Sequence, residues 1–171
     1  MNHRTYFILS LLLIITGLPV KYIAAQDHPP LSIDGQILDG RDKLEGAYVR
    51  IEKNGNFDRE IRTDRRGKFD FELELFNEFM IYFGKEGYVT KKIYVDTRTI
   101  SEGQIKSSYL RYGGWKVEIF PDDLGVDIAI LDKPIGKVTY SDEYNSFIND
   151  DFYTKTIQNR LDKLVEDLRR A

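Results

Sequence analysis

The sequence predicts a mainly β protein, an antiparallel β-sandwich followed by a C-terminal α-helix. Three observations support this prediction. The run from Lys68 to Leu75 alternates polar and apolar residues without interruption, as a half-buried strand does. Turn signals rich in Gly, Asn and Asp separate short strand-like runs between Ile33 and Thr97. Near the C-terminus the apolar spacing then changes to that of a helix.

The first segment, residues 1–25, is typical of a cleaved signal peptide. Arg4 precedes an apolar run, the helix breakers Gly17 and Pro19 follow it, and we place the cleavage site after Ala25. An uncleaved anchor is the alternative, but the apolar run is shorter than the ~20 residues that a membrane span needs. We therefore expect an exported protein that is periplasmic or associated with the cell envelope, with no membrane span after cleavage.

Length and charge exclude several classes of protein. The 171 residues fit one domain with an extension. The chain has 25 Lys and Arg against 28 Asp and Glu, and removal of the leader takes away Arg4 and Lys21, so the mature charge is about −5. This acidic balance does not favour nucleic-acid binding. The sequence has no cysteine, so packing rather than disulfides has to stabilise the exported chain.

Residues 26–97 are expected to form the sandwich. A first strand runs from Leu31 to the turn pair Asp39-Gly40, and a second covers Ala47–Ile51. Asn54-Gly55 then favours a two-residue hairpin turn, because both residues tolerate positive φ. The third strand, Phe57–Thr63, has the weakest pattern.

The second half of this block continues in the same way. Asp64–Gly67 predicts a type I turn that leads into the Lys68–Leu75 strand. Phe79–Phe83 is apolar on both faces, as expected of a strand buried in the middle of a sandwich. After the turn Gly84–Gly87, alternation resumes over Tyr88–Val95.

Residues 98–171 are expected to form a C-terminal extension. Trp115–Phe120 predicts a further strand with Trp115, Val117 and Ile119 on one face. Val126–Leu131 and Lys137–Tyr140 are short strand candidates, and Asp142–Asp151 is expected to be an acidic loop.

A helix is predicted over about residues 150–170. The apolar residues there recur at spacings of four, three and four, and so align on one side: Ile157, Leu161, Leu164 and Leu168. Asp150 and its neighbours can cap the start, and Arg169 and Arg170 suit the negative end of the helix dipole. The stripe is expected to dock on its own domain, and a partner chain is the alternative.

Four segments together resemble the carboxypeptidase regulatory-like domain: Ile33-Asp-Gly-Gln-Ile-Leu-Asp39, Leu44-Glu-Gly-Ala-Tyr-Val-Arg-Ile51, Thr63-Asp-Arg-Arg-Gly-Lys-Phe69 and Lys85-Glu-Gly-Tyr88. Glu45 stands where that family usually has proline. The match covers about residues 31–97, less than half of the mature chain. The resemblance implies a transthyretin-like sandwich. It also implies a domain that accompanies metallocarboxypeptidases or extends outer-membrane receptors and is not itself catalytic.

The residue types argue against familiar catalytic centres. The chain has only two histidines, His3 in the leader and His28 in the segment after it. A Ser-His-Asp centre and a zinc site with His or Cys ligands therefore lack their residues. We predict a protein that is not an enzyme, with no catalytic residue, no cofactor and no metal. Catalysis by paired carboxylates remains the open alternative.

The candidate contact residues fall into two groups. Tyr109, Tyr112 and Trp115 cluster in a Gly-containing segment, where aromatic rings can stack on sugars or anchor a protein. The favoured interpretation is that Trp115 packs in the core, because it is in phase with Val117 and Ile119, and that the tyrosines cover its rim. The second group is the stripe of Ile157, Leu161, Leu164 and Leu168. We predict a structural or protein-interaction module with a protein partner in the cell envelope, and a carbohydrate-binding module that uses exposed aromatics as the alternative.

Overall fold

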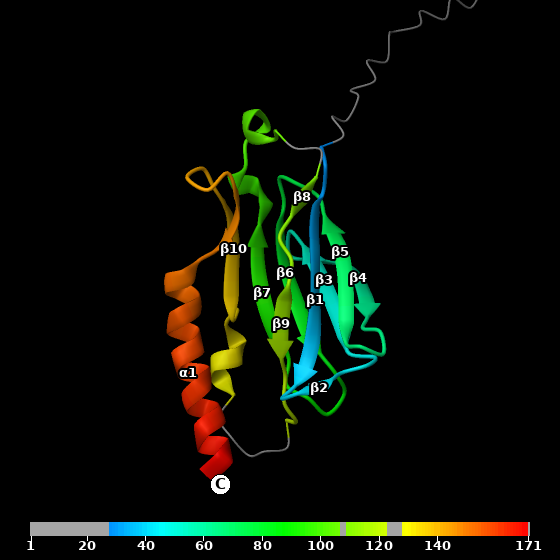
Figure 1. Ribbon diagram of the computed structural model, residues 1–171, viewed down its shortest axis with the longest axis vertical. Coiled ribbons are helices and arrows are strands. Elements are labelled where there is room, and N and C mark those ends of the chain that lie inside the picture. The colour runs from blue at the N-terminus through cyan, green and yellow to red at the C-terminus, as the bar shows by residue number, and fades with distance from the viewer. Residues whose placement is uncertain (1–27, 107–108, 123–127, 171) are drawn as a thin grey trace, which may run out of the picture.

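The computed structural model describes residues 28–106, 109–122 and 128–170, with the backbone alone at 164, 165 and 167–170. The signal peptide expected at residues 1–25 lies outside the described residues. Two β-sheets face each other, and helix α1 lies beside them (Figure 1). The protein is therefore a β-sandwich with a C-terminal helix, as its sequence predicts.

Sheet A is narrow and is built around one strand. Strand β1 (Leu31–Asp39) pairs with β5 (Lys68–Leu73) antiparallel, and the two-residue strand β2 (Asp42–Lys43) continues this pairing at the end of β1. Strands β8 (Leu110–Arg111) and β9 (Trp115–Glu118) pair with the other side of β1 and run parallel to it.

Sheet B is wider and has the order β11-β10-β7-β6-β3-β4. Its bounds are β3 (Tyr48–Lys53), β4 (Asn56–Arg62), β6 (Glu78–Gly84), β7 (Lys91–Asp96), β10 (Gly136–Ser141) and β11 (Ser146–Asn149). In the described part of the chain, three short 3-10 helices connect the strands: η1 (Thr97–Thr99), η2 (Glu102–Gln104) and η3 (Ala129–Asp132). The neighbours within sheet B are antiparallel except β7 and β10, which run parallel.

The predicted turns between residues 33 and 97 are confirmed. Asn54 and Gly55 have φ values of 51° and 78° and join β3 to β4, as a two-residue hairpin requires. Gly67 has a φ of 68° and ends the turn before β5. A Cβ atom there would lie 2.6 Å from the carbonyl oxygen of Ile37, so glycine also lets the two backbones approach closely.

The core lies between the sheets and is formed by the alternating inward residues. Strand β6 contributes Phe79, Ile81 and Phe83, each 2% exposed or less. The sequence suggested burial on both faces of this strand, but Met80 and Tyr82 lie half-buried on the outer face of sheet B. Strand β6 is central within its sheet, whereas the sandwich covers only one of its faces.

Helix α1 (Asp151–Arg170) confirms the predicted helix and its cap. The Asp150 carboxylate accepts a hydrogen bond of 2.9 Å from the backbone N–H of Tyr153. Ile157 and Leu161 are 4% and 3% exposed and belong to the core, and the helix packs against β10 and η3. The side chains of Leu164 and Leu168 lie outside the described residues.

The extension differs from the sequence analysis in three ways. The strands of the extension that pair with residues 26–97 run parallel to their neighbours rather than antiparallel: β8 and β9 beside β1, and β10 beside β7. The strand candidate Val126–Leu131 is wrong where it is described, because residues 129–132 form η3. The loop expected over Asp142–Asp151 contains strand β11, whose Phe147 side chain is buried beside the ring of Tyr140.

Candidate protein-interaction face

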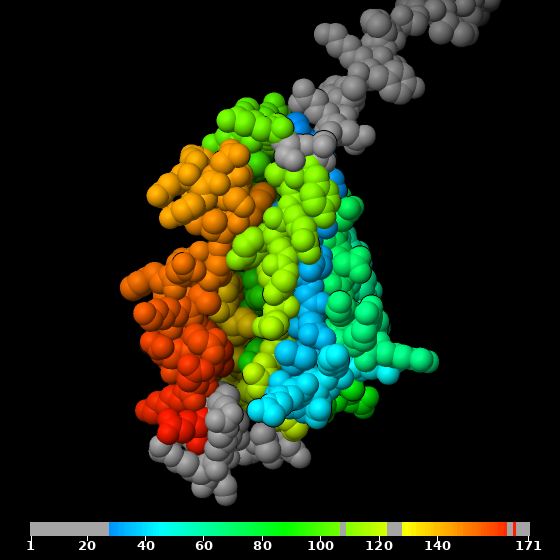
Figure 2. Space-filling model, in the orientation of Figure 1, coloured from blue at the N-terminus to red at the C-terminus, as the bar shows by residue number. Residues whose placement is uncertain are grey.

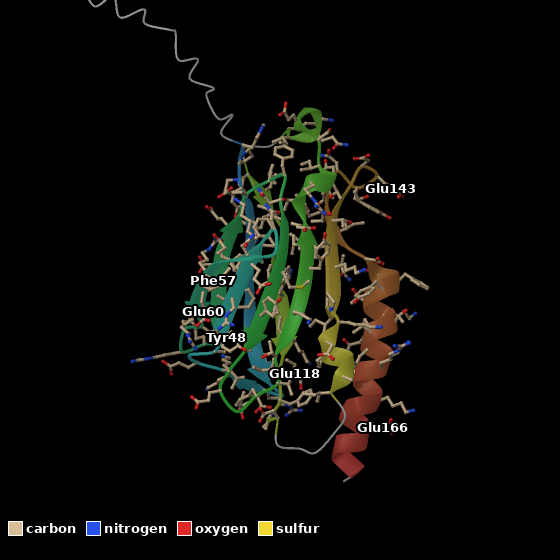
Figure 3. The ribbon with its side chains drawn as sticks, turned by 180° about the vertical axis from the view of Figure 1, so that it is seen from behind. Tyr48, Phe57, Glu60, Glu118, Glu143 and Glu166 are labelled. Carbon is tan, nitrogen blue, oxygen red and sulfur yellow. The ribbon has the colours of Figure 1, made fainter. Side chains whose placement is uncertain are left out.

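The outer face of sheet B carries an aromatic surface with charged side chains of both signs between the rings. Cross-strand pairing places Arg50 of β3 opposite Tyr82 of β6, and Tyr82 opposite Lys92 of β7. Figure 3 shows this face toward the viewer, and no helix of the described chain lies over it. We call it the tyrosine face and define it by six residues: Tyr48, Arg50, Met80, Tyr82, Lys92 and Tyr94.

Hydrogen bonds and cationic neighbours hold the tyrosine rings in place. The Tyr48 hydroxyl lies 2.7 Å from the Thr90 hydroxyl, and the Tyr82 hydroxyl donates to Glu52 Oε2 at 2.8 Å. The Arg50 guanidinium lies 5.5 Å from the centre of the Tyr48 ring. Because the rings are already fixed, a partner that packs on them would order few additional side-chain torsions.

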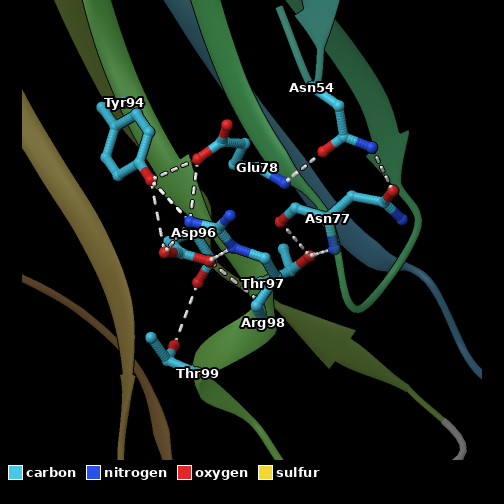
Figure 4. A network of polar contacts seen from close by, with 8 residues as sticks. All are labelled: Asn54, Asn77, Glu78, Tyr94, Asp96, Thr97, Arg98 and Thr99. Carbon is cyan, nitrogen blue, oxygen red and sulfur yellow. Dashed lines mark hydrogen bonds and ion pairs between the residues drawn. The ribbon is translucent and has the colours of Figure 1, made fainter.

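A polar network fixes the Tyr94 end of the face (Figure 4). Arg98 donates two hydrogen bonds to the Asp96 carboxylate, at 2.9 and 2.8 Å, and forms an ion pair of 2.8 Å with Glu78. The Tyr94 hydroxyl donates to Glu78 Oε2 at 3.0 Å. These four residues come from β6, β7 and η1, so the network joins two central strands to the segment that follows them.

The same network explains the pKa shifts in this region. Burial and the hydrogen bond to Glu78 raise the pKa of Tyr94 to about 12. The hydrogen bonds from Arg98 lower the pKa of Asp96. Burial, together with the hydrogen bond to Glu52, raises the pKa of Tyr82. At neutral pH Tyr82 and Tyr94 therefore stay protonated, and the carboxylate of Asp96 stays charged.

A hollow of about 410 Å³ lies at the edge of the tyrosine face. Tyr82 and Lys92 line the hollow, and so do Leu131 of η3 and Ile128, which directly precedes η3. Ile128 is 39% exposed, so an apolar side chain is available at the rim. A flat aromatic surface next to a small hollow is suited to receive a protruding side chain of a partner.

The structure does not gather the three aromatic candidates into one platform. Tyr109 is 60% exposed. Trp115 is half-buried and meets the Phe83 ring edge-on at 5.9 Å, and Tyr112 meets Trp115 at 6.1 Å. Trp115 therefore packs against the core, which is the interpretation that the sequence favours. The carbohydrate-binding hypothesis stays a prediction.

The tyrosine face was missed at the sequence level, although its signal is visible there. Tyr48 and Arg50 occupy the polar phase of one predicted strand, and Lys92 and Tyr94 occupy that of another. The alternating pattern alone predicts that such side chains are exposed to solvent. Only the pairing of β3, β6 and β7 brings them together. Among the described residues, no three His, Asp or Glu side chains converge as metal ligands.

Comparison with known proteins gives no family. No family model matches the chain, and no curated protein matches it. Among solved structures, it is similar to 3-chlorocatechol 1,2-dioxygenase from Rhodococcus opacus, at 12% identity and a TM-score of 0.42 over 57% of this chain and 62% of that chain. Catechol 1,2-dioxygenase from an Acinetobacter species is similar at 15% identity and a TM-score of 0.43, over 66% and 59%.

The Bacillus anthracis TIE protein is similar at 18% identity and a TM-score of 0.41, over 54% of this chain and 17% of that chain. The chain thus spans less than two thirds of each of these three solved chains. TM-scores this low transfer no activity and no ligand to this protein.

The prediction that the chain is not an enzyme is corrected by these neighbours. That prediction rested in part on a sandwich that serves only as an accessory, whereas the similar solved structures include dioxygenases.

Proposed function

We propose that this chain is an exported protein of the cell envelope that acts as a protein-interaction module, with the tyrosine face as its contact surface. One observation carries the proposal: the outer side of β3, β6 and β7 displays three tyrosines, a methionine and an arginine that do not belong to the core. Tyr, Met and Arg are the residue types enriched at protein interfaces.

The competing explanation is a solvated sheet face. Such a face would expose flexible charged side chains, whereas the rings of Tyr48, Tyr82 and Tyr94 are half-buried and hydrogen-bonded. Rigid, amphipathic rings lose little conformational entropy on binding. The hollow beside Tyr82 supplies an anchoring point of the kind that dominates binding energy.

Point variants test the proposal without removing the helix. The tagged protein is used to capture partners from native envelope, and the experiment is repeated with Tyr82→Ala and, separately, with Arg50→Glu. We expect each variant to capture at least about tenfold less partner than the unaltered protein, because both substitutions change the centre of the tyrosine face. Tyr144→Ala is the matched control, since Tyr144 is 64% exposed in the turn between β10 and β11.

The outcome separates the two explanations. A solvated face predicts that all three variants retain the partner equally, and that result overturns the proposal. Equal loss in Tyr144→Ala also overturns it, because the effect would then not belong to this face. Thermal unfolding of each variant shows that a loss of binding is not a loss of structure.

Export and family membership are part of the same proposal. The leader at residues 1–25 supports export, and N-terminal sequencing of the protein recovered from cells should start at Gln26. In the described residues no helix is long and apolar enough to cross a bilayer. The carboxypeptidase regulatory-like resemblance is supported by position, because its four blocks coincide with β1, the entry to β3, the turn before β5 and the turn after β6.

A further inference from the structure

A cleft of about 580 Å³ lies between helix α1 and strand β9, away from the tyrosine face (Figure 2). It exists because sheet A is narrower than sheet B. Strand β9 is the edge of sheet A, and α1 packs on β10 at the far side of sheet B. The inner surface of β7 between them is left to the cleft, whose apolar lining is Phe120, Ile135 and Leu161.

Lys91 is the distinctive residue of this cleft. It occupies the inward phase of β7 and is 7% exposed, which makes it the only charged residue in the buried class among those described. Its ammonium nitrogen lies 5.4 Å from the centre of the Phe120 ring. No carboxylate of the described chain lies within 4.0 Å of it, because Lys91 takes part in none of the ion pairs found there.

The ammonium group is nevertheless accessible from the cleft. No side-chain nitrogen of the described residues is both fully buried and without a hydrogen-bond partner, so the Lys91 nitrogen keeps contact with the open space. A buried ammonium group without an adjacent counter-ion is energetically unfavourable. Burial accordingly lowers the pKa of Lys91, and the more distant charges of Glu118 and Asp162 oppose this effect. A methionine would fill the same space without that cost.

The rim of the cleft has the opposite character. Gln158, Asp162 and Glu166 recur every four residues along α1 and face the cleft, and Glu118 faces it from β9. Glu118 and Glu166 are labelled in Figure 3 on the β9 and α1 sides. All four are exposed, so water screens their charges far more than that of Lys91. The exposed Lys116 of β9 also lines the rim. The cleft thus combines a buried cation, an apolar wall and an outer ring in which three carboxylates outnumber one exposed ammonium group.

We propose that this cleft binds a small organic carboxylate, with its carboxylate on the ammonium group of Lys91 and its hydrogen-bond donors toward Glu118, Asp162 and Glu166. The apolar part of such a ligand would lie on Phe120 and Leu161. The volume suits a molecule of one or two residues or sugar units. The donors can be hydroxyl groups, as in a sugar acid, or an ammonium group, as in an amino acid or short peptide, and the test separates these sources.

Lysine side-chain NMR of the purified protein measures binding directly. The protein is labelled with 13C at lysine Cε, and D-glucuronate or L-alanyl-L-alanine is added at constant pH and ionic strength. We expect a saturable shift of the Lys91 Cε signal at millimolar concentration with at least one of the two, and none with glucose, which lacks the carboxylate. A response to glucuronate alone identifies a sugar acid, and a response to the dipeptide alone identifies a peptide-like ligand.

Two variants locate the site. Lys91→Met keeps the length and apolar stem of the side chain, so we expect it to fold and to weaken binding at least about tenfold. Because this variant has no Lys91 signal, its binding is followed at the Cε signal of Lys116, which lines the same cleft. Lys68→Met, at an exposed lysine on the outer side of β5, should bind as the unaltered protein does. The proposal is overturned if neither carboxylate gives a saturable Lys91 shift up to about 50 mM. It is equally overturned if glucose binds as well, or if Lys91→Met retains binding.

Discussion

Replacing Leu161 by alanine tests whether the terminal helix belongs to the fold or is held for a partner. Leu161 is 3% exposed and packs in the core. The substitution removes three buried carbon atoms, at about 0.8 kcal/mol each, which amounts to about 2.4 kcal/mol. Because Leu161 also lines the cleft, water can fill part of the space it leaves. We therefore expect a loss of about 2–3 kcal/mol, at the lower end for leucine truncation.

The assay is thermal unfolding followed by circular dichroism. For a chain of this length the expected loss corresponds to a decrease in Tm of about 5–10 °C. Lys163→Ala is the control, because Lys163 is exposed on the same helix and because lysine and alanine both favour helix formation. It should change the stability by less than about 0.5 kcal/mol. If the two variants melt at the same temperature, the helix is not docked as described and its stripe is free for another chain.

Three further predictions concern backbone and pH. Gly67→Ala should destabilise the protein more than Gly46→Ala, although both glycines have positive φ. The reason is that a Cβ atom at Gly67 would lie 2.6 Å from the carbonyl oxygen of Ile37 in β1, whereas a Cβ atom at Gly46 meets nothing within 4 Å. Chemical unfolding measures the difference in the free energy of unfolding. The hydrogen bonds from Arg98 lower the pKa of Asp96 in the folded protein below its ordinary value of 3.8. The charged carboxylate therefore stabilises the fold above about pH 3.8, and this contribution is lost as the pH falls through the lowered pKa of the folded state. Asp96→Asn should remove this dependence, so that Tm decreases less steeply when the pH is lowered. The pKa of Tyr94 is raised from 10.0 to about 12 in the folded protein. The protonated phenol therefore stabilises the fold fully below pH 10, and this contribution is lost as the pH rises toward 12. Tyr94→Phe should reduce the loss of stability at alkaline pH, measured as Tm against pH.

The longer strands between residues 31 and 96 were predictable because each carries its own signal, whereas the two-residue strand β2 lies in a segment, Arg41–Gly46, that was predicted to be a charged loop. Strand β5 shows this most clearly, since its burial alternates at every position from Lys68 to Leu73. Each strand is also bounded by a turn whose residues favour the observed backbone, such as Asn54-Gly55. Local pattern and local turn chemistry agree there, and no long-range information is needed to find the elements.

The pairing of the extension was not predictable from the same signals. The inward phase of Val117 and Ile119 was predicted and is observed, since both are buried. Phase shows which side of a strand meets the core, but not which strand lies beside it or in which direction it runs. Strand β11 was missed for another reason. It has four residues, and Phe147 is its only buried side chain, so no alternation could be seen.

The cleft depends on the extension in a way that no single segment reveals. Lys91 interrupts the apolar phase between Val89 and Ile93, which the sequence shows, and a lysine at the start of a strand normally reaches water. Here β9 and α1 arrive from opposite sides and enclose it. Residues 26–97 therefore supply the lysine, and residues 98–171 bury it. Binding by Lys91 should accordingly be sensitive to changes in α1 that leave the sandwich itself intact.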